Sequence, residues 1–218
     1  MSKSQDYQGV YRVGGIFAII SGILGALLIG LFLLVGRIPT EGGALLEAID
    51  SNSLIFRAAF GFMLVFQLTI LPVIPSLYLS VKGVARTHAM FGGFISGIGA
   101  ILGIAFASVF YSLLSLSEIF STSFGAESPA LAAAAQFAIS FSNILFLVSY
   151  ALLAIGLFLI FGLAILKGIF AKWMGWLGVL TGIVILLSII PPLNALFFVA
   201  TALMAAWFLA IGAKLYRA

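Results

Sequence analysis

The chain has 218 residues, of which 64% are hydrophobic and only 7% are charged. A water-soluble domain carries about 25% charged residues, so this composition excludes an ordinary soluble protein and predicts a surface that faces lipid. The chain has no cysteine and one histidine, His88, which excludes disulfides, thiolate catalysis, iron–sulfur clusters and two-histidine metal sites. The net charge of +4 is dispersed, so we expect no nucleic-acid surface.

Six apolar stretches, each about as long as a membrane-crossing helix, follow one another along the chain. A helix needs about 20 mostly apolar residues to span a bilayer, and the alternation typical of strands is absent. The sequence predicts an all-α, polytopic transmembrane helical bundle that forms one domain over residues 1–218. Pro191 and Pro192 separate the last two spans, which we expect to form a tight hairpin. The six predicted spans are residues 13–36, 54–81, 90–116, 137–166, 173–190 and 193–213.

Positive charges are distributed unevenly between the two sides that these spans define. Eight of the ten Lys and Arg residues fall on the side that carries both termini, and five of the six acidic residues fall on the other. Because cytoplasmic loops are enriched in Lys and Arg, we expect both termini in the cytoplasm. Lys3 and Arg12 precede the first span, but its apolar stretch exceeds the roughly 7 to 15 residues of a signal peptide, so we expect it to stay uncleaved.

The first outer loop, RIPTEGGALLEAIDSNS, contains a short amphipathic segment at residues 43–49 and a cluster of charges. We expect Ser51 or Ser53 to cap the second span. Arg37 and Arg57 can form ion pairs with the acids of this loop, which are Glu41, Glu47 and Asp50. Two interpretations remain open: a solvated ion cluster that contributes little to stability, or a lid over a ligand site.

The second outer loop, SEIFSTSFGAESPALAAAAQ, contains a helix-start signal. A serine followed by a proline, here Ser128 and Pro129, is favoured at the first positions of a helix. A helix from there to Lys167 would be about 58 Å long at 1.5 Å per residue, which exceeds the membrane thickness. We expect its Ala-rich first part to project outward or to lie along the interface; a kink near residues 140–143 is the alternative.

Span two contains the segment QLTILPVIP, in which two prolines follow a glutamine and a threonine. Pro72 and Pro75 each lack an N–H and interrupt helical hydrogen bonding, so we expect a kink. Pro72 lies about 27 Å from the start of the span, near its cytoplasmic end rather than at the midplane. An amide that faces lipid is costly, so we expect Gln67 to contact Asn143 of span four. A small polar cavity around these two amides is the alternative.

Small residues recur at helical spacing in span three. Gly93 and Gly97, and likewise Gly99 and Gly103, are four residues apart, which favours close helix packing. Packing within the chain and an interface with a partner protein both fit this pattern. Other side chains suit contact with lipid headgroups. These are Lys82, Arg86, Lys167, Lys172, Trp173 and Trp176.

Four segments carry a resemblance to a known family. They are YRVGGIFAIISGILG, SLIFRAAFGFMLVFQ, SLYLSVKGVARTHAMFGGFI and LFLIFGLAILKGIFAKWMGWLGVLTG, which together touch most of the chain. With these segments the chain resembles a family of uncharacterised prokaryotic six-helix membrane proteins that is known only as a domain of unknown function. The resemblance implies the six-helix fold and no activity.

The polar residues of the spans limit the function. No Asp, Glu, Lys, Arg or His lies near the middle of a span, although proton relays and ion-coupled carriers usually need such residues. We therefore expect no enzyme, no cofactor and no metal.

The first hypothesis is a non-catalytic accessory or scaffold subunit of the prokaryotic cell membrane. It would act through lipid contacts and through helix contacts with other membrane proteins or with a second copy. The alternative is a small uncoupled channel or carrier for a neutral or apolar solute. Its path would run near Gln67, Pro72, Pro75 and Asn143.

Overall fold

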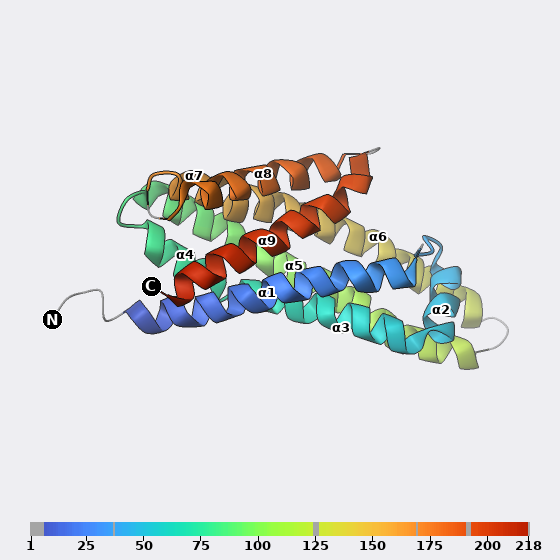
Figure 1. Ribbon diagram of the computed structural model, residues 1–218. Coiled ribbons are helices and arrows are strands. Elements are labelled where there is room, and N and C mark those ends of the chain that lie inside the picture. Colours follow the sequence, from blue (N-terminus) through green and yellow to red (C-terminus); the bar gives the residue numbers. More distant parts are fainter. Residues whose placement is uncertain (1–6, 37, 124–126, 169, 191–192, 218) are drawn as a thin grey trace.

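The computed structural model describes residues 7–217 except 37, 124–126, 169 and 191–192, so the predicted hairpin turn at Pro191 and Pro192 and the ion pairs of Arg37 lie outside the described residues. The described residues are helical almost throughout and contain no strand. Figure 1 shows the helices packed as one elongated bundle. The elements are α1 (Gln8–Val35), α2 (Gly42–Ser51), α3 (Ser53–Ile70), α4 (Val73–Val81), α5 (Arg86–Thr122), α6 (Glu127–Leu153), a π-helix (Ala154–Ile160), α7 (Phe161–Ile165), α8 (Lys172–Ser188), a 3-10 turn (Leu193–Ala195) and α9 (Leu196–Tyr216).

The chain is a multi-pass membrane protein by the length and composition of its helices. Five helical stretches in the described residues are long and apolar enough to cross a bilayer. A sixth apolar helix, α8, has 17 residues, or about 26 Å, which is slightly short of the roughly 30 Å hydrocarbon core. The predicted all-α fold is therefore confirmed, whereas the count of six spans stays a prediction. The five longer stretches are Gln8–Val35, Ser53–Val81, Arg86–Thr122, Ser128–Ile165 and Leu196–Tyr216.

Two helices are much longer than a membrane is thick. α5 has 37 residues, or about 56 Å, and runs six residues beyond the predicted end of span three, so part of the predicted second outer loop is helical. The stretch from Ser128 to Ile165 has 38 residues. The alternative of a kink near residues 140–143 is wrong, because α6 stays α-helical to Leu153 and departs from that geometry only in the π-helix.

The amphipathic helix α2 packs on the projecting ends of α5 and α6, and we call this end of the bundle the α2 end (Figure 1). Its apolar residues Leu45, Leu46 and Ile49 are buried. The Gly42 N–H donates a hydrogen bond to Gln136 Oε1 on α6 (2.8 Å), and Ser117 Oγ on α5 donates one to the Leu46 carbonyl (2.7 Å). The predicted segment at residues 43–49 is thus confirmed as a helix that packs on the bundle.

Two local predictions for the first loop are wrong. The N-cap of α3 is Asn52 without a side-chain cap bond, and neither Ser51 nor Ser53 caps this helix. Arg57 forms its ion pair with Glu118 of α5 rather than with an acid of the first loop. Because α5 continues past the predicted end of span three, it carries Glu118 to Arg57.

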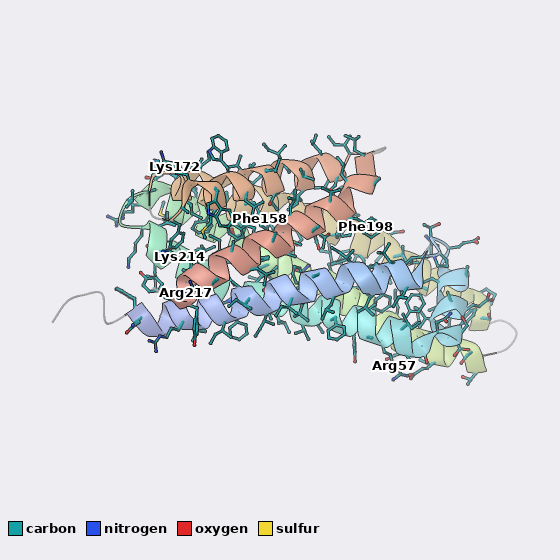
Figure 2. All side chains as sticks on the ribbon, in the orientation of Figure 1. Arg57, Phe158, Lys172, Phe198, Lys214 and Arg217 are labelled. Carbon is teal, nitrogen blue, oxygen red and sulfur yellow. The ribbon has the colours of Figure 1, made fainter. Side chains whose placement is uncertain are left out.

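The start of α1 and the end of α9 lie side by side at the opposite end, which we call the terminal end (Figure 1). A Cβ atom at Gly15 would lie 2.6 Å from the Tyr216 backbone nitrogen, and one at Gly212 would lie 2.8 Å from the Gly15 carbonyl oxygen. Glycine therefore lets the two backbones approach closely. Figure 2 shows Lys172, Lys214 and Arg217 towards this end and Arg57 towards the other.

The structure packs one of the two predicted glycine pairs of α5 closely and leaves the other open. A Cβ atom at Gly99 would lie 3.0 Å from the Leu153 nitrogen, and one at Gly103 would lie 2.5 Å from Gln67 Oε1, so both predicted positions pack closely. At Gly97 a Cβ atom would meet nothing within 4 Å, and at Gly93 only Tyr78 at 4.0 Å. Gly92 also packs closely, because a Cβ atom there would lie 3.2 Å from the Gly156 carbonyl oxygen. Gly92 is seven residues before Gly99, so it extends the same packed face along α6 and the π-helix.

Close packing of α1 on α9 predicts that Gly15→Ala destabilises the protein. The added methyl group meets backbone atoms that cannot rotate away, and such overpacking costs about 1–3 kcal/mol. Gly30→Ala on the same helix is the matched control, because a Cβ atom there meets nothing within 4 Å. Titration of both variants with SDS in mixed micelles, followed by circular dichroism, compares their unfolding. Equal stability of the two variants would contradict the packing described here.

Candidate functional site

Three adjoining cavities form one crevice in the half of the bundle nearer the α2 end. The deep chamber has a volume of about 60 Å³, the middle chamber about 180 Å³ and the mouth about 630 Å³. Phe146 of α6 lines all three chambers. Phe32, Met63 and Phe106 line both the deep and the middle chamber, and Asn143 lines the middle chamber and the mouth. The three cavities therefore adjoin one another and share Phe146 as a common wall residue.

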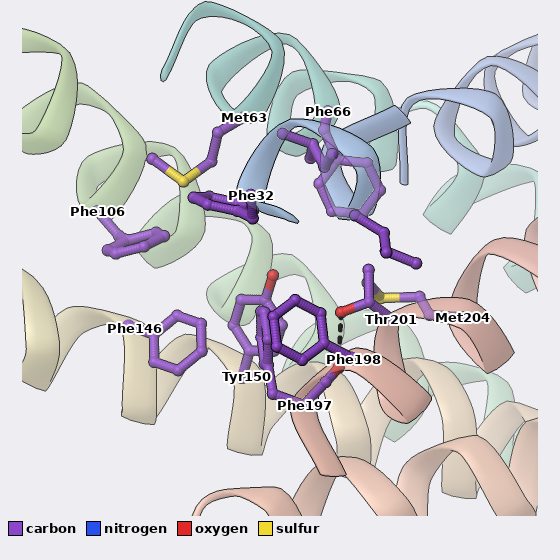
Figure 3. Close-up of a pocket in the computed structure, with 12 residues that line it drawn as sticks. Phe32, Met63, Phe66, Phe106, Phe146, Tyr150, Phe197, Phe198, Thr201 and Met204 are labelled. Carbon is purple, nitrogen blue, oxygen red and sulfur yellow. Dashed lines mark hydrogen bonds between the residues drawn. The ribbon is translucent and has the colours of Figure 1, made fainter. Parts of the chain in front are cut away.

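Aromatic side chains from five helices, α1, α3, α5, α6 and α9, make the walls of this crevice. The ring of Phe146 lies 4.3 Å from that of Tyr150, 5.2 Å from Phe106 and 5.6 Å from Phe197, measured between ring centroids. The contributing residues repeat at helical spacing, as with residues 143, 146 and 150 on α6. Residues three, four and seven apart share one face of a helix, so each helix presents its aromatic face to the same space (Figure 3).

A cluster of large aromatic residues closes the crevice on the side of the terminal end. Phe66 lines the deep chamber, and its ring centroid lies 6.4 Å from that of Phe208. Phe208 in turn packs on Phe158 and Trp207, and all three are fully buried. Trp207 Nε1 donates a hydrogen bond to the Met174 carbonyl (3.1 Å), which fixes the indole. The crevice thus has a floor in this structure.

Few polar groups face the crevice. Thr201 Oγ1 donates to the Phe197 carbonyl (2.8 Å), and this is the hydrogen bond drawn among the residues of Figure 3. The Tyr150 side chain is 9% exposed and its hydroxyl points into the deep chamber (Figure 3), where it forms no hydrogen bond with the described residues. Asn143 is exposed at the mouth. Ser188 also lines the mouth, and its hydroxyl donates to the Ile185 carbonyl (2.7 Å). The crevice is therefore largely apolar, with one isolated hydroxyl at depth and an amide at its opening.

The predicted contact between Gln67 and Asn143 does not form. Gln67 is fully buried, and neither its Oε1 nor its Nε2 has a hydrogen-bond partner among the described residues. It lies against Gly103 at the level of Ser149, whose hydroxyl donates instead to the Gly99 carbonyl (2.8 Å). Ser149 is six residues from Asn143 along α6, or about 9 Å. The two amides thus line no common cavity among those described above. The depth of Gln67 relative to Asn143 depends on how α3 and α6 pack, and the spacing of residues in the sequence does not determine it.

The rest of the proline segment holds α1 in place. The helix is interrupted at Leu71 and Pro72, as the prolines predict. Ser21 Oγ of α1 donates either to Thr69 Oγ1 of α3 (2.7 Å) or to the Phe17 carbonyl of α1 (2.9 Å). Ser76 Oγ lies 2.8 Å from the Val10 carbonyl and 3.0 Å from the Pro72 carbonyl, either of which can accept its proton. Pro72 and Ser76 therefore belong to a helix contact and do not line the crevice.

The predicted headgroup residues differ in their surroundings. Trp173 and Trp176 are 56% and 63% exposed, and Arg86, Lys167 and Lys172 are also exposed. Lys82 is half-buried, and its Nζ lies 4.4 Å from the ring centroid of Tyr7. A cation over an aromatic face is attracted by the ring quadrupole, so Lys82 contacts α1 as well.

Sequence reasoning missed the aromatic crevice itself. Fourteen per cent of the residues are aromatic, but most membrane helices carry aromatic side chains, and composition does not distinguish lipid-facing from cavity-facing rings. The spacing of Asn143, Phe146 and Tyr150 was the available signal. Within the described residues, no group of three or more His, Cys, Asp or Glu side chains could hold a metal ion.

One family model matches the chain. The model, described as Domain of unknown function (DUF4386), covers residues 13–215, which include all the membrane helices except the first residues of α1 and the last residue of α9. No curated protein and no solved structure matches the chain.

The unpaired amide of Gln67 predicts that Gln67→Met stabilises the protein. A buried polar group without a partner costs about 1–3 kcal/mol, and methionine has a similar shape without that cost. Thermal unfolding in nanodiscs should show a higher midpoint for this variant. Gln136→Met, which removes the bonded amide at α2, should lower the midpoint instead. A lower midpoint for Gln67→Met would show that the amide has a polar partner, such as a buried water.

Proposed function

This chain belongs to the DUF4386 family of unknown function, and we propose that it is a non-catalytic, uncoupled membrane carrier for an apolar molecule. The observation that carries this proposal is the aromatic crevice, which is open at its mouth and closed by the floor of Phe66 and Phe208. A carrier needs a site that is open to one side at a time, whereas a static channel needs a continuous path. The floor therefore favours a carrier over a channel.

The size and lining of the crevice suit a small apolar molecule. An apolar cavity of about 150 Å³ can bind benzene, and the middle chamber alone has about 180 Å³. Each favourable contact between aromatic rings contributes about 0.5–1.5 kcal/mol beyond the burial of area. Phe106, Phe146 and Phe197 offer such contacts from three helices. The absence of ionisable residues from the middle of the spans agrees with transport that is not coupled to ions.

Release on the other side requires the floor to move, and α3 and α4 contain one interruption suited to this. A Cβ atom at Gly103 would lie 2.5 Å from Gln67 Oε1, and one at Gly93 would lie 4.0 Å from the Tyr78 ring. These contacts place Gln67 at the level of Gly103 and Tyr78 at the level of Gly93 along α5. The break at Pro72 lies between them.

A second interruption lies at a matching depth on the neighbouring helix. A Cβ atom at Gly99 would lie 3.0 Å from the Leu153 nitrogen, and one at Gly92 would lie 3.2 Å from the Gly156 carbonyl oxygen. The π-helix, Ala154–Ile160, therefore begins between the levels of Gly99 and Gly92. Single-turn π segments are frequent at functional sites. We assign the hinge of the carrier to the level shared by this π-helix and the proline break.

An accessory subunit is the second candidate function. It is favoured by the uncovered face of α5 at Gly97, where a Cβ atom would meet nothing within 4 Å. The neighbouring Phe94 and Ile98 are exposed apolar residues. Small residues on an open helix face permit close approach of another membrane helix, either of a partner protein or of a second copy.

The orientation follows from the charges at the two ends. The terminal end carries Lys172, Lys214 and Arg217, whereas the α2 end carries the ion pair of Arg57 with Glu118 (Figure 2). Lys and Arg are enriched on the cytoplasmic side of membrane proteins. We therefore place the terminal end in the cytoplasm of a prokaryotic cell, so that the crevice opens in the outer half of the membrane.

Single cysteines test this orientation, because the natural chain has none. Asn52→Cys at the α2 end should react with a membrane-impermeant maleimide in intact cells. Gly83→Cys, between α4 and α5, should react only after the cells are permeabilised. Both positions are exposed, so accessibility within the protein does not differ. The reverse labelling pattern would overturn the orientation.

Binding of N-phenyl-1-naphthylamine, whose fluorescence rises in apolar sites, tests the crevice. The purified chain in phosphatidylcholine nanodiscs should show saturable fluorescence beyond that of empty nanodiscs. Phe146→Ala should weaken this binding about tenfold, which corresponds to about 1.4 kcal/mol, because Phe146 lines all three chambers. Phe198→Ala, at the same crevice, should also weaken it.

Phe137→Ala is the matched control for this experiment. Phe137 lies on α6 like Phe146, but it is 72% exposed and lines none of the three chambers. Its removal should leave probe binding unchanged. No saturable signal above empty nanodiscs, or equal losses in Phe137→Ala and Phe146→Ala, would refute the proposed binding site.

A further inference from the structure

The Tyr150 hydroxyl is a polar group placed at the deep end of an otherwise apolar space. The side chain is 9% exposed and its oxygen points into the deep chamber (Figure 3). The other hydroxyl of this chamber, on Thr201, donates its proton to the Phe197 carbonyl. The Tyr150 hydroxyl therefore remains the free donor of the chamber among the described residues. A molecule that fills the chamber removes water from this hydroxyl and must replace the lost hydrogen bond.

The walls beside this hydroxyl are formed by ring faces and edges. The Tyr150 ring lies 4.3 Å from the Phe146 centroid and 6.0 Å from the Phe197 centroid, with interplanar angles of 39° and 47°. Phe106 extends the same wall, 5.2 Å from Phe146. Aromatic pairs favour tilted and offset arrangements at these distances. A flat ring that enters the crevice can continue this arrangement, whereas a flexible acyl chain cannot.

The mouth carries a second polar group in line with the first. Asn143 and Tyr150 are seven residues apart on one face of α6, or about 10 Å along the helix. Asn143 lines the middle chamber and the mouth, and Tyr150 lines the deep chamber. The body of a bound molecule would thus lie between an amide at the opening and a hydroxyl donor at depth.

From these positions, and resting on the proposed function, we infer that the ligand is a flat aromatic molecule with a hydrogen-bond acceptor, which enters acceptor first and is held by the Tyr150 hydroxyl. The ring lies across the deep and middle chambers and packs against Phe106 and Phe146, which line both. A purely hydrocarbon ligand leaves the hydroxyl without a partner and binds more weakly. A lipid acyl chain has the same disadvantage and lacks the ring contacts.

Two probes of nearly equal shape test this inference. 2-Acetylnaphthalene carries a carbonyl oxygen, and 2-isopropenylnaphthalene carries a CH₂ group in its place. Both are used as competitors of N-phenyl-1-naphthylamine on the full chain in phosphatidylcholine nanodiscs. The ketone should bind about fivefold more tightly than the hydrocarbon, as expected for one hydrogen bond. In Tyr150→Phe, which keeps the ring and loses the donor, the two affinities should converge.

Tyr111→Phe is the matched control, because Tyr111 is 47% exposed and lines none of the three chambers. It should keep the fivefold preference for the ketone. Equal affinities of the two probes in the natural chain would overturn the inference, and so would a preference that persists in Tyr150→Phe. Saturable binding of N-phenyl-1-naphthylamine would leave the proposed function intact in both cases. If neither that dye nor the two probes bind saturably, the proposed function fails together with the inference.

Discussion

Close approach of helix backbones at glycine is the constraint on which the rest of this structure depends. Lipid tails are as apolar as leucine side chains, so membrane helices associate mainly through tight packing. The terminal half of the bundle meets this requirement with glycines that face a neighbouring helix. They are Gly14, Gly15, Gly22, Gly92, Gly99, Gly103, Gly156, Gly162, Gly175, Gly178, Gly182 and Gly212. These contacts hold the helix backbones of this half close together.

The other half of the same helices replaces glycine with large aromatic side chains. α5 changes from Gly99 and Gly103 to Phe106, and α6 carries Phe146 and Tyr150 before the glycines of the π-helix and α7. Rings of this size hold the helix axes apart, and irregular packing among them leaves the crevice. The same bundle thus has glycine-mediated helix packing in its terminal half and a crevice lined by aromatic residues towards its α2 end. The floor at Phe66 lies where these two kinds of packing meet.

Polar groups inside the bundle are mostly satisfied by the backbone of their own helix. Ser96, Thr181 and Thr201 each donate to a carbonyl four residues earlier, which removes the cost of an unpaired group in an apolar medium. Gln67 and Tyr150 do not follow this pattern. The Gln67 amide has no partner and is sealed in packing, whereas the Tyr150 hydroxyl faces an open space. Only the second is placed to meet a ligand.

Hydropathy made most of the fold predictable, because burial of apolar residues in lipid depends on local composition. The predicted stretches agree closely with α1, with α3 and α4, and with α9. The proline break was also predictable, because a missing N–H interrupts a helix in any surroundings. The long helical stretch from Ser128 to Ile165 was predictable from the helix-start signal at Ser128 and Pro129. The length of α5 was not, because its last residues are polar and are stabilised by α2. The ion pair of Arg57 was not predictable either, because its partner Glu118 lies 61 residues away in the chain.

By itself, the sequence determined that this is an all-helical, multi-pass membrane protein with unequal charge at its two ends and a break at Pro72. Each of these properties depends on residues that are close together in the chain. The tertiary structure alone decided which glycine face of α5 is packed, that Gln67 and Asn143 lie at different depths, and that Tyr150 faces a crevice. Those outcomes depend on the rotation and depth of each helix relative to its neighbours. Such relations are set by contacts between distant residues, which the periodicity of a single helix does not contain.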